Sequence, residues 1–220
     1  MHYMNKLLTL FTIGFLFLIN DANAQLVDID SNVYKTVKLG TQTWMASNLS
    51  VSHFRNGNPI PQAKTVAEWI QADLDEQPAW CYYKNDSTTE EQYGKLYNWY
   101  AVTDPRGLAP DKWHIPNEEE WIRVTTFIGS KKAAGTRMKH TTGWKKNGNG
   151  TNTSGLSMLP GGSRSDQGKF SGKGGYGYWW SFDEKGGDDA WGRNLGFGHG
   201  YILKNSFIKG NGMSVRCVRD

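Results

Sequence analysis

The chain has 220 residues, of which 38% are hydrophobic, enough for one domain with a buried core. Aromatic residues make up 13% and include 10 tryptophans, a composition that excludes an intrinsically disordered chain. The net charge of +4 is spread thinly, without a stripe of Lys and Arg, and this argues against a nucleic-acid-binding protein.

The first 24 residues have the three parts of a cleavable export signal. Lys6 supplies positive charge, Leu7–Ile19 is mainly apolar, and Ala22-Asn23-Ala24 has the small residues of a cleavage site. As a helix, Leu7–Ile19 would reach only about 20 Å into a hydrocarbon core roughly 30 Å thick. We therefore expect residues 1–24 to be a signal peptide and residues 25–220 a single domain without a transmembrane segment. Its expected location is secreted, periplasmic or at the cell surface.

The domain is expected to open with a β-hairpin. Val33–Leu39 has strand character, Gly40-Thr41 is a turn, and Gln42–Ala46 is the returning strand. This hairpin would tie down the start of the domain.

Capping residues in the sequence predict two helices. Thr65 and Glu68 form a capping box, which predicts a short helix from about Val66 to Asp75. Asn117 is the cap of a second helix, in which Glu118–Glu120 place negative charge on the first turn and Gly129 marks the end.

After Lys131 the chain becomes rich in glycine, serine and asparagine. Each glycine costs up to about 1 kcal/mol inside a helix, so this half is expected to contain short strands and long loops rather than helices of normal length. The predicted strands are Gly155–Leu159, Tyr178–Phe182, Ala190–Leu195 and Ser214–Val218. The last of these is expected to pair with the first hairpin, which would bring the two ends of the domain together.

The chain has two cysteines, Cys81 and Cys217. An even number of cysteines in an exported domain favours a disulfide, and closing so long a loop would stabilise the fold by several kcal/mol. We expect a Cys81–Cys217 bridge, with two buried free thiols as the alternative.

Six motifs in order resemble a known family. They are Val37–Leu49, Tyr93–Ala101, Trp113–Trp121, Leu159–Arg164, Tyr178–Ser181 and Ser214–Asp220. Together they resemble the Fibrobacter succinogenes major paralogous domain, a family of exported bacterial domains, over nearly the whole of residues 25–220.

This resemblance implies an α+β domain with a C-type-lectin-like fold, distantly similar to formylglycine-generating enzymes. Such a fold has two short helices, antiparallel strands, a paired N- and C-terminal strand, and a loop-rich second half with the binding surface. Formylglycine-generating enzymes use a pair of active-site cysteines, and Cys217 lies inside the final strand motif, so this activity is not expected. The chain also has no Gly-x-Ser-x-Gly nucleophile motif.

Aromatic residues of the second half are the candidates for ligand binding, because Trp and Tyr rings stack on the C–H faces of sugars and polar neighbours bind hydroxyl groups. The expected ligand-binding residues are Tyr176, Tyr178, Trp179, Trp180, Asp183, Glu184, Trp191 and Arg193, with Tyr201 and Phe207 as the next candidates. Adjacent strand residues point to opposite faces, so Trp179 and Trp180 cannot both face the same core. One of them is expected to be covered by loops or exposed.

A calcium site is a weaker expectation. Asp183, Glu184, Asp188 and Asp189 place four carboxylates on a glycine-bearing loop, and Ca²⁺ prefers oxygen ligands from such segments. The histidines show no short ligand spacing such as His-x3-His, so the sequence does not predict a zinc site, and His114 is expected to be structural.

The sequence therefore predicts a non-catalytic binding module for a glycan or a cell-surface protein, with no other cofactor. One alternative is a polysaccharide hydrolase that uses two carboxylates of the acidic loop as general acid and base. Another is a structural, fimbrial or adhesin subunit, for which Leu26–Ser31 is the only spare segment that could act as a donor strand.

Overall fold

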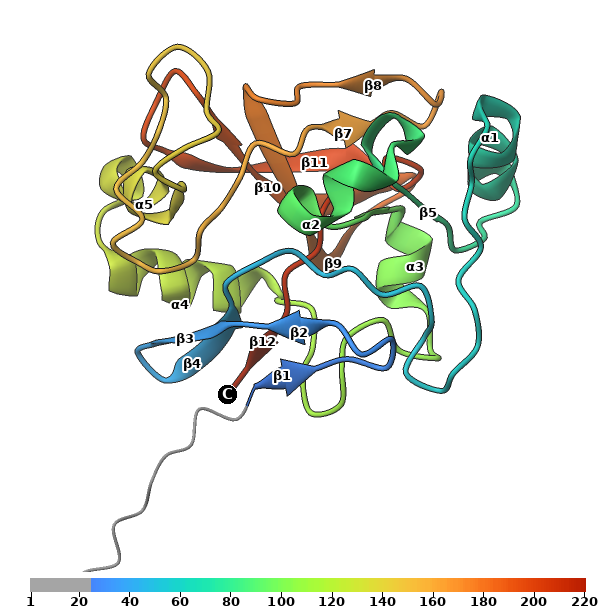
Figure 1. Ribbon diagram of the computed structural model, residues 1–220, viewed down its shortest axis with the longest axis horizontal. Coiled ribbons are helices and arrows are strands. Elements are labelled where there is room, and N and C mark those ends of the chain that lie inside the picture. The colour runs from blue at the N-terminus through green and yellow to red at the C-terminus, as the bar shows by residue number, and fades with distance from the viewer. Residues whose placement is uncertain (1–24) are drawn as a thin grey trace, which may run out of the picture.

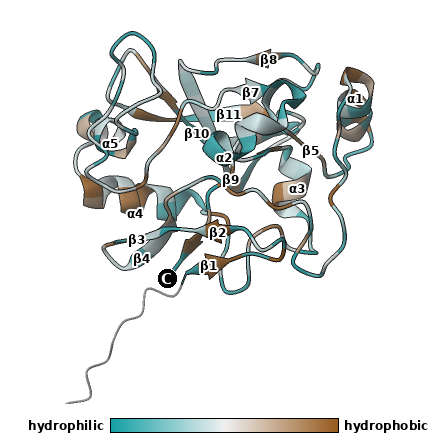
Figure 2. Ribbon diagram, viewed as in Figure 1, coloured by the Kyte–Doolittle hydropathy of each residue, from teal (hydrophilic) through white to brown (hydrophobic). Residues whose placement is uncertain are grey.

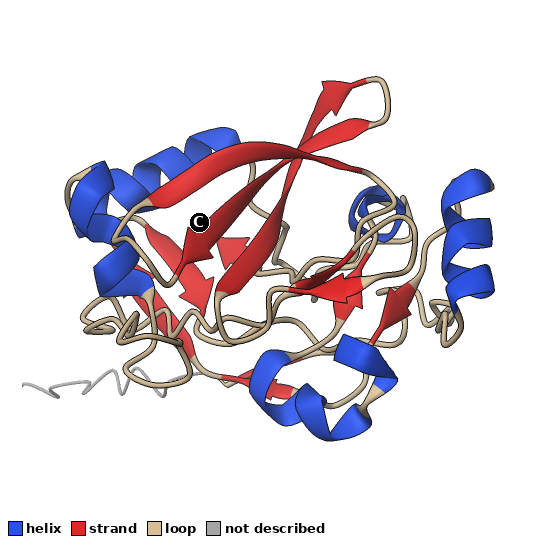
Figure 3. Cartoon of the chain, turned by 90° about the horizontal axis from the view of Figure 1, so that it is seen from above, coloured by secondary structure: helices blue, strands red, loops and turns tan. Residues whose placement is uncertain are grey.

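Short helices surround a set of antiparallel sheets in the computed structural model, which describes residues 25–220 (Figure 1). The expected signal peptide, residues 1–24, lies outside the described residues. The α-helices are α1 (Val66–Leu74), α2 (Glu90–Tyr93), α3 (Trp99–Thr103), α4 (Glu118–Ile128) and α5 (Lys131–Met138), and the 3-10 helices are η1 (Tyr83–Asn85) and η2 (Ser87–Thr89). The strands are β1 (Leu26–Val27), β2 (Val33–Tyr34), β3 (Thr36–Leu39), β4 (Gln42–Met45), β5 (Trp80–Cys81), β6 (Leu96–Tyr97), β7 (Ser163–Arg164), β8 (Phe170–Ser171), β9 (Tyr176–Gly186), β10 (Asp189–Gly196), β11 (Ile202–Ile208) and β12 (Val218–Arg219). Viewed from above, the helices lie at the periphery and the strands run between them, so the α+β class is confirmed (Figure 3).

The hairpin β3–β4 near the N-terminus and the last strand of the domain meet in one sheet, in the order β12-β4-β3. Trp44 on β4 pairs with Val37 on one side and with Val218 on the other. The hairpin turn uses Gly40 with φ of +65°, a conformation that glycine adopts without steric cost. Both the N-terminal hairpin and its pairing with the C-terminal strand are confirmed.

Both predicted helices are present, and each begins at the predicted cap. In α1 the Thr65 side chain accepts from the Glu68 backbone N–H and the Glu68 carboxylate accepts from the Thr65 N–H. Asn117 and Glu120 form the same reciprocal pair at the start of α4. Figure 2 colours α4 in alternating hydrophobic and hydrophilic bands, as expected for a helix with one buried face.

The longest strands form the second three-stranded sheet, in the order β11-β10-β9. The predicted strands Tyr178–Phe182 and Ala190–Leu195 lie within β9 and β10. β11 was not predicted, because its polar stretch Lys204–Ser206 hides the strand pattern.

Three predictions about the second half are wrong. α5 is an unpredicted helix of eight residues in the region expected to contain short strands and long loops. Gly155–Leu159 is not a strand, since Gly155 and Ser157 have φ of +74° and +52°, which no β-strand accommodates. In the last motif the strand begins only at Val218, whereas Ser214 forms an isolated bridge to Trp179.

The possible donor strand is already paired. Leu26 and Val27 pair with Tyr34 and Val33, and the Leu26 side chain is buried. Leu26–Ser31 is therefore part of the domain rather than a spare segment.

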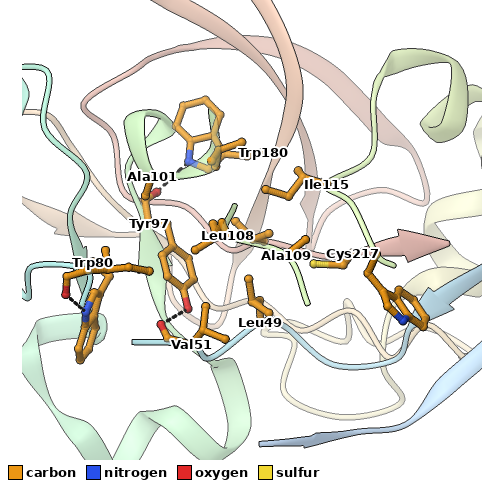
Figure 4. Close-up of a cluster of buried hydrophobic side chains, with 14 of the residues drawn as sticks. Leu49, Val51, Trp80, Tyr97, Ala101, Leu108, Ala109, Ile115, Trp180 and Cys217 are labelled. Carbon is orange, nitrogen blue, oxygen red and sulfur yellow. Dashed lines mark hydrogen bonds between the residues drawn. The ribbon is translucent and has the colours of Figure 1, made fainter. Parts of the chain in front are cut away.

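Three hydrophobic clusters hold the elements together. The central cluster includes Leu49, Val51, Tyr97, Trp180 and Cys217. In Figure 4 the Tyr97 hydroxyl donates to the Val51 carbonyl and the Trp180 indole N–H donates to the Tyr97 carbonyl, each at 2.8 Å. The α4 cluster includes Trp44, Trp121, Val124, Trp179 and Leu195, and the α1 cluster includes Trp69, Cys81, Tyr83 and Leu96.

The expected Cys81–Cys217 disulfide is not formed. Both cysteines are free and fully buried, Cys81 in the α1 cluster and Cys217 in the central cluster. Burial raises the pKa of the Cys81 thiol to about 12 and that of Cys217 above its usual range, so both stay protonated at neutral pH. The two thiols thus act as small apolar core groups.

None of the helices within residues 25–220 has both the length and the apolar character needed to cross a membrane.

Candidate functional site

A run of partly exposed aromatic side chains lies on and beside the sheet β11-β10-β9. Tyr176 and Tyr178 are two residues apart on β9 and therefore project from the same face. The loop between β10 and β11 and the strand β11 supply the others. We call this set the aromatic series: Tyr176, Tyr178, Phe197, His199, Tyr201 and Phe207.

The rings of the aromatic series form two contacting groups, one of Phe207, Tyr178, Tyr176 and Phe197 and one of His199 and Tyr201. The Tyr176 and Tyr178 rings are stacked, with centroids 6.3 Å apart, and Phe207 packs edge-on against Tyr178 at 5.7 Å. In the second group His199 and Tyr201 are stacked at 5.2 Å. A Cβ at Gly196 would lie 3.1 Å from the Tyr176 ring and 3.2 Å from the His199 ring, so the missing side chain lets both rings approach β10.

Solvent reaches the aromatic series from one side. Tyr176 and Tyr201 are 40% and 41% exposed, and Tyr178, Phe197 and Phe207 are half-buried. Burial raises the pKa of the Tyr178 phenol above its usual value, so its hydroxyl remains a hydrogen-bond donor at neutral pH. Aromatic ring faces and a phenol hydrogen-bond donor are thus both available to a ligand.

Two asparagines share this face of the sheet. Asn194 pairs with Tyr178 across β10 and β9, and the Asn205 side-chain amide on β11 donates to the Asn194 side-chain oxygen at 2.6 Å. Asn205 is exposed, so its remaining amide groups are available to hydroxyl groups of a ligand.

The predicted ligand residues Trp191 and Arg193 lie on the opposite face of the sheet. Trp191 is half-buried under the Lys204 ammonium, 3.9 Å from the ring centroid, and Lys185 lies at 5.6 Å. Arg193 is 4% exposed and forms an ion pair of 2.7 Å with Glu118 at the start of α4. The structure therefore separates these two residues from Tyr176 and Tyr178.

Trp179 and Trp180 are both fully buried, which corrects their assignment as ligand-binding residues. The two rings do face opposite ways, as expected for neighbours on a strand, and enter the α4 cluster and the central cluster respectively. Each indole N–H is satisfied inside the protein, by Asn48 Oδ1 and by the Tyr97 carbonyl. Neither ring can stack on a ligand at the surface.

Three of the four carboxylates of the predicted calcium loop have separate partners. Asp183 accepts from the Glu118 backbone N–H and the Ser181 hydroxyl, Glu184 pairs with Lys209, and Asp189 pairs with Lys185. Within residues 25–220, no three of these acidic side chains bring an oxygen within 4.8 Å of one another. Asp183, Glu184, Asp188 and Asp189 thus do not bring three carboxylates together at one point, the kind of oxygen cluster that Ca²⁺ prefers.

Sequence reasoning missed Phe197, His199, Asn194 and Asn205. The face of Asn194 follows from its pairing with Tyr178 across β10 and β9, which only the strand register gives. Phe197 and His199 lie in a loop, where no periodicity indicates the direction of a side chain.

A family model matches most of the chain. It is the Fibrobacter succinogenes major domain, and it covers residues 37–219. Searches of curated proteins and of solved structures each found no match.

Proposed function

We propose, since the chain belongs to the Fibrobacter succinogenes major domain family, that it is an exported, non-catalytic module that binds a glycan through the aromatic series. The partner would be a polysaccharide or the glycan of a cell-surface protein. Residues 1–24, with the pattern of an export signal, support a location where such polymers occur.

The observation that carries this proposal is the set of partly exposed rings, gathered in two contacting groups on and beside one sheet. Tyr176 and Tyr201 each keep about two fifths of their surface in solvent. Aromatic faces bind the C–H faces of sugar rings, and nearby amide groups bind hydroxyl groups. Tyr178, Asn194 and Asn205 supply those polar groups beside the rings.

A C-type-lectin-like fold is part of the proposal. The paired terminal strands, the two longer capped helices and the loop-rich second half support it. We expect binding to be independent of calcium, because the aromatic series does not include the acidic loop. EDTA should leave the measured affinity unchanged.

The test is binding to a glycan array, followed by pull-down on insoluble polysaccharides. Tyr176→Ala and Tyr201→Ala should each weaken binding about 2- to 10-fold, and the double variant about 4- to 100-fold, because each ring contributes about 0.5–1.5 kcal/mol. Phe182→Ala is the matched control, since Phe182 is an aromatic residue of β9, 51% exposed, and outside the aromatic series.

Equal loss in Phe182→Ala and Tyr176→Ala would contradict the assignment of the aromatic series. A blank array together with blank pull-downs would contradict glycan binding itself. Loss of glycan binding on EDTA treatment would contradict calcium-independent binding and would favour a calcium site in the acidic loop.

A further inference from the structure

Three side chains from distant segments bring possible metal ligands together at the start of α4. His114, Glu120 and Asp220 each offer one ligand atom, and these atoms lie within 4.8 Å of one another. Among residues 25–220, no other group of three or more His, Cys, Asp or Glu side chains brings its ligand atoms this close together. The residues span more than 100 positions of sequence, so no short ligand spacing indicates the group.

Backbone contacts fix two of the three ligands next to each other. The His114 N–H donates to the Val218 carbonyl at 3.0 Å, and the Val218 N–H donates to the His114 carbonyl at 2.8 Å. This bridge holds the end of β12 beside His114 and so places Asp220 at the site.

The Glu120 carboxylate is held in one orientation. Its Oε2 accepts from the Asn117 backbone N–H at 2.9 Å in the capping box, and its Oε1 lies 2.5 Å from His114 Nε2. Supporting hydrogen bonds of this kind orient ligands in metal sites.

The group is open to solvent on one side. Glu120 is 4% exposed, whereas the side chains of His114 and Asp220 are 47% and 70% exposed. The competing cation is Arg123, whose guanidinium is 3.5 Å from Asp220 and half exposed, a separation and exposure typical of weak ion pairs.

We propose that His114 Nε2, Glu120 Oε1 and an Asp220 carboxylate oxygen bind one divalent transition-metal ion of the Zn²⁺ class. An imidazole ligand favours such ions over Ca²⁺ and Mg²⁺, which prefer oxygen alone. The imidazole binds through Nε2 with its proton on Nδ1, so coordination replaces the present hydrogen bond to Glu120. Three protein ligands leave a fourth position for water. This proposal is independent of glycan binding.

The experiment is isothermal titration of the tag-free full chain with ZnCl₂ at pH 7.5, with thermal unfolding in parallel. One saturable site is expected, and Zn²⁺ should raise the unfolding midpoint because it joins the end of β12 to α4. Asp220→Asn and His114→Ala should each weaken Zn²⁺ binding at least tenfold. CaCl₂ in place of ZnCl₂ should give no saturable heat.

Glu119→Gln and His140→Ala are the matched controls, since each removes a residue of the same kind outside the group, and both should bind Zn²⁺ within twofold of the unsubstituted chain. Asp220 is largely exposed, so Asp220→Asn should leave the fold intact. Weaker Zn²⁺ binding in this variant would therefore report the loss of a ligand and not a folding defect. Absence of saturable binding up to 1 mM ZnCl₂, or unchanged binding in Asp220→Asn and His114→Ala, would overturn the proposal.

Discussion

Buried cations bonded to backbone carbonyls stabilise the loops at the scale of single residues. Arg216 is 1% exposed and donates to Asn48 Oδ1 and to the carbonyls of Met45, Leu156 and Ser157. Within residues 25–220 it has no carboxylate partner, and burial lowers its pKa to about 9. Arg164, also fully buried, donates to the carbonyls of Ala63, Thr65 and Gly168. These guanidinium groups thus supply buried donors to carbonyls from segments far apart in the sequence.

Arg216→Met should lower the free energy of unfolding by at least about 3 kcal/mol, because several buried oxygens would lose their donor. Urea-induced unfolding of the variant measures this change. Arg123→Met is the control, since Arg123 is half exposed, and it should change stability by less than about 1 kcal/mol. A stable Arg216→Met protein would show that water replaces the guanidinium.

Lys139 gives a pH-dependent contribution to stability. It is 2% exposed, its ammonium donates to the carbonyls of Gly196 and His199, and burial lowers its pKa from 10.5 to about 8. Between these two pH values the unfolded chain binds more protons at this residue than the folded protein does. The free energy of unfolding should therefore rise with pH from about 8 to about 10.5, by up to about 3 kcal/mol.

Lys139→Met should remove that rise. The measurement is the urea midpoint of both proteins from pH 7 to pH 10.5, in which the difference between the two curves isolates Lys139. Parallel curves would mean that Lys139 keeps its ordinary pKa in the folded protein.

At the scale of elements, glycine is required where a neighbouring segment packs so closely on the backbone that a side chain would not fit. α5 contains Gly135 although glycine disfavours helices. A Cβ there would lie 2.5 Å from the Gly200 carbonyl oxygen and 2.8 Å from the Leu195 side chain. The absent side chain lets α5 pack directly on the loop that leads into β11.

Gly135→Ala should destabilise the protein by about 1–3 kcal/mol, because the steric clash exceeds the gain of about 1 kcal/mol in helix propensity. Gly198→Ala is the matched control, since a Cβ at Gly198 would meet nothing within 4 Å. It should be neutral or slightly stabilising. Thermal unfolding of both variants is the measurement, and a more stable Gly135→Ala protein would contradict the packing argument.

At the scale of the whole molecule, segments far apart in the sequence pack on the same central strands. The terminal sheet joins Trp44 to Val218, and Trp180 of β9 donates to the carbonyl of Tyr97. The aromatic series lies on the sheet that this core supports, and the His114–Glu120–Asp220 group lies where β12 meets α4. Both proposed sites therefore depend on the complete domain and not on a local motif.

The sequence alone determined the features that depend on neighbouring residues. The caps Thr65 and Asn117 act within one helical turn, and the turn at Gly40 acts between adjacent strands, so both helices and the hairpin could be predicted. The six ordered motifs likewise indicated the family. Tyr176, Tyr178, Tyr201 and Phe207, named as candidate ligand residues from the sequence, are partly exposed, and their binding role stays a prediction.

Only the tertiary structure decided which side chains are buried and which come together. Trp179 and Trp180 are buried because other segments cover both faces of β9, and composition carries no information about that cover. The tertiary structure also decided that Cys81 and Cys217 stay apart as free thiols, that α5 needs glycine at Gly135, and that His114 and Asp220 meet. Each depends on contacts between residues far apart in the chain, whose positions follow from packing of the whole domain rather than from local propensity.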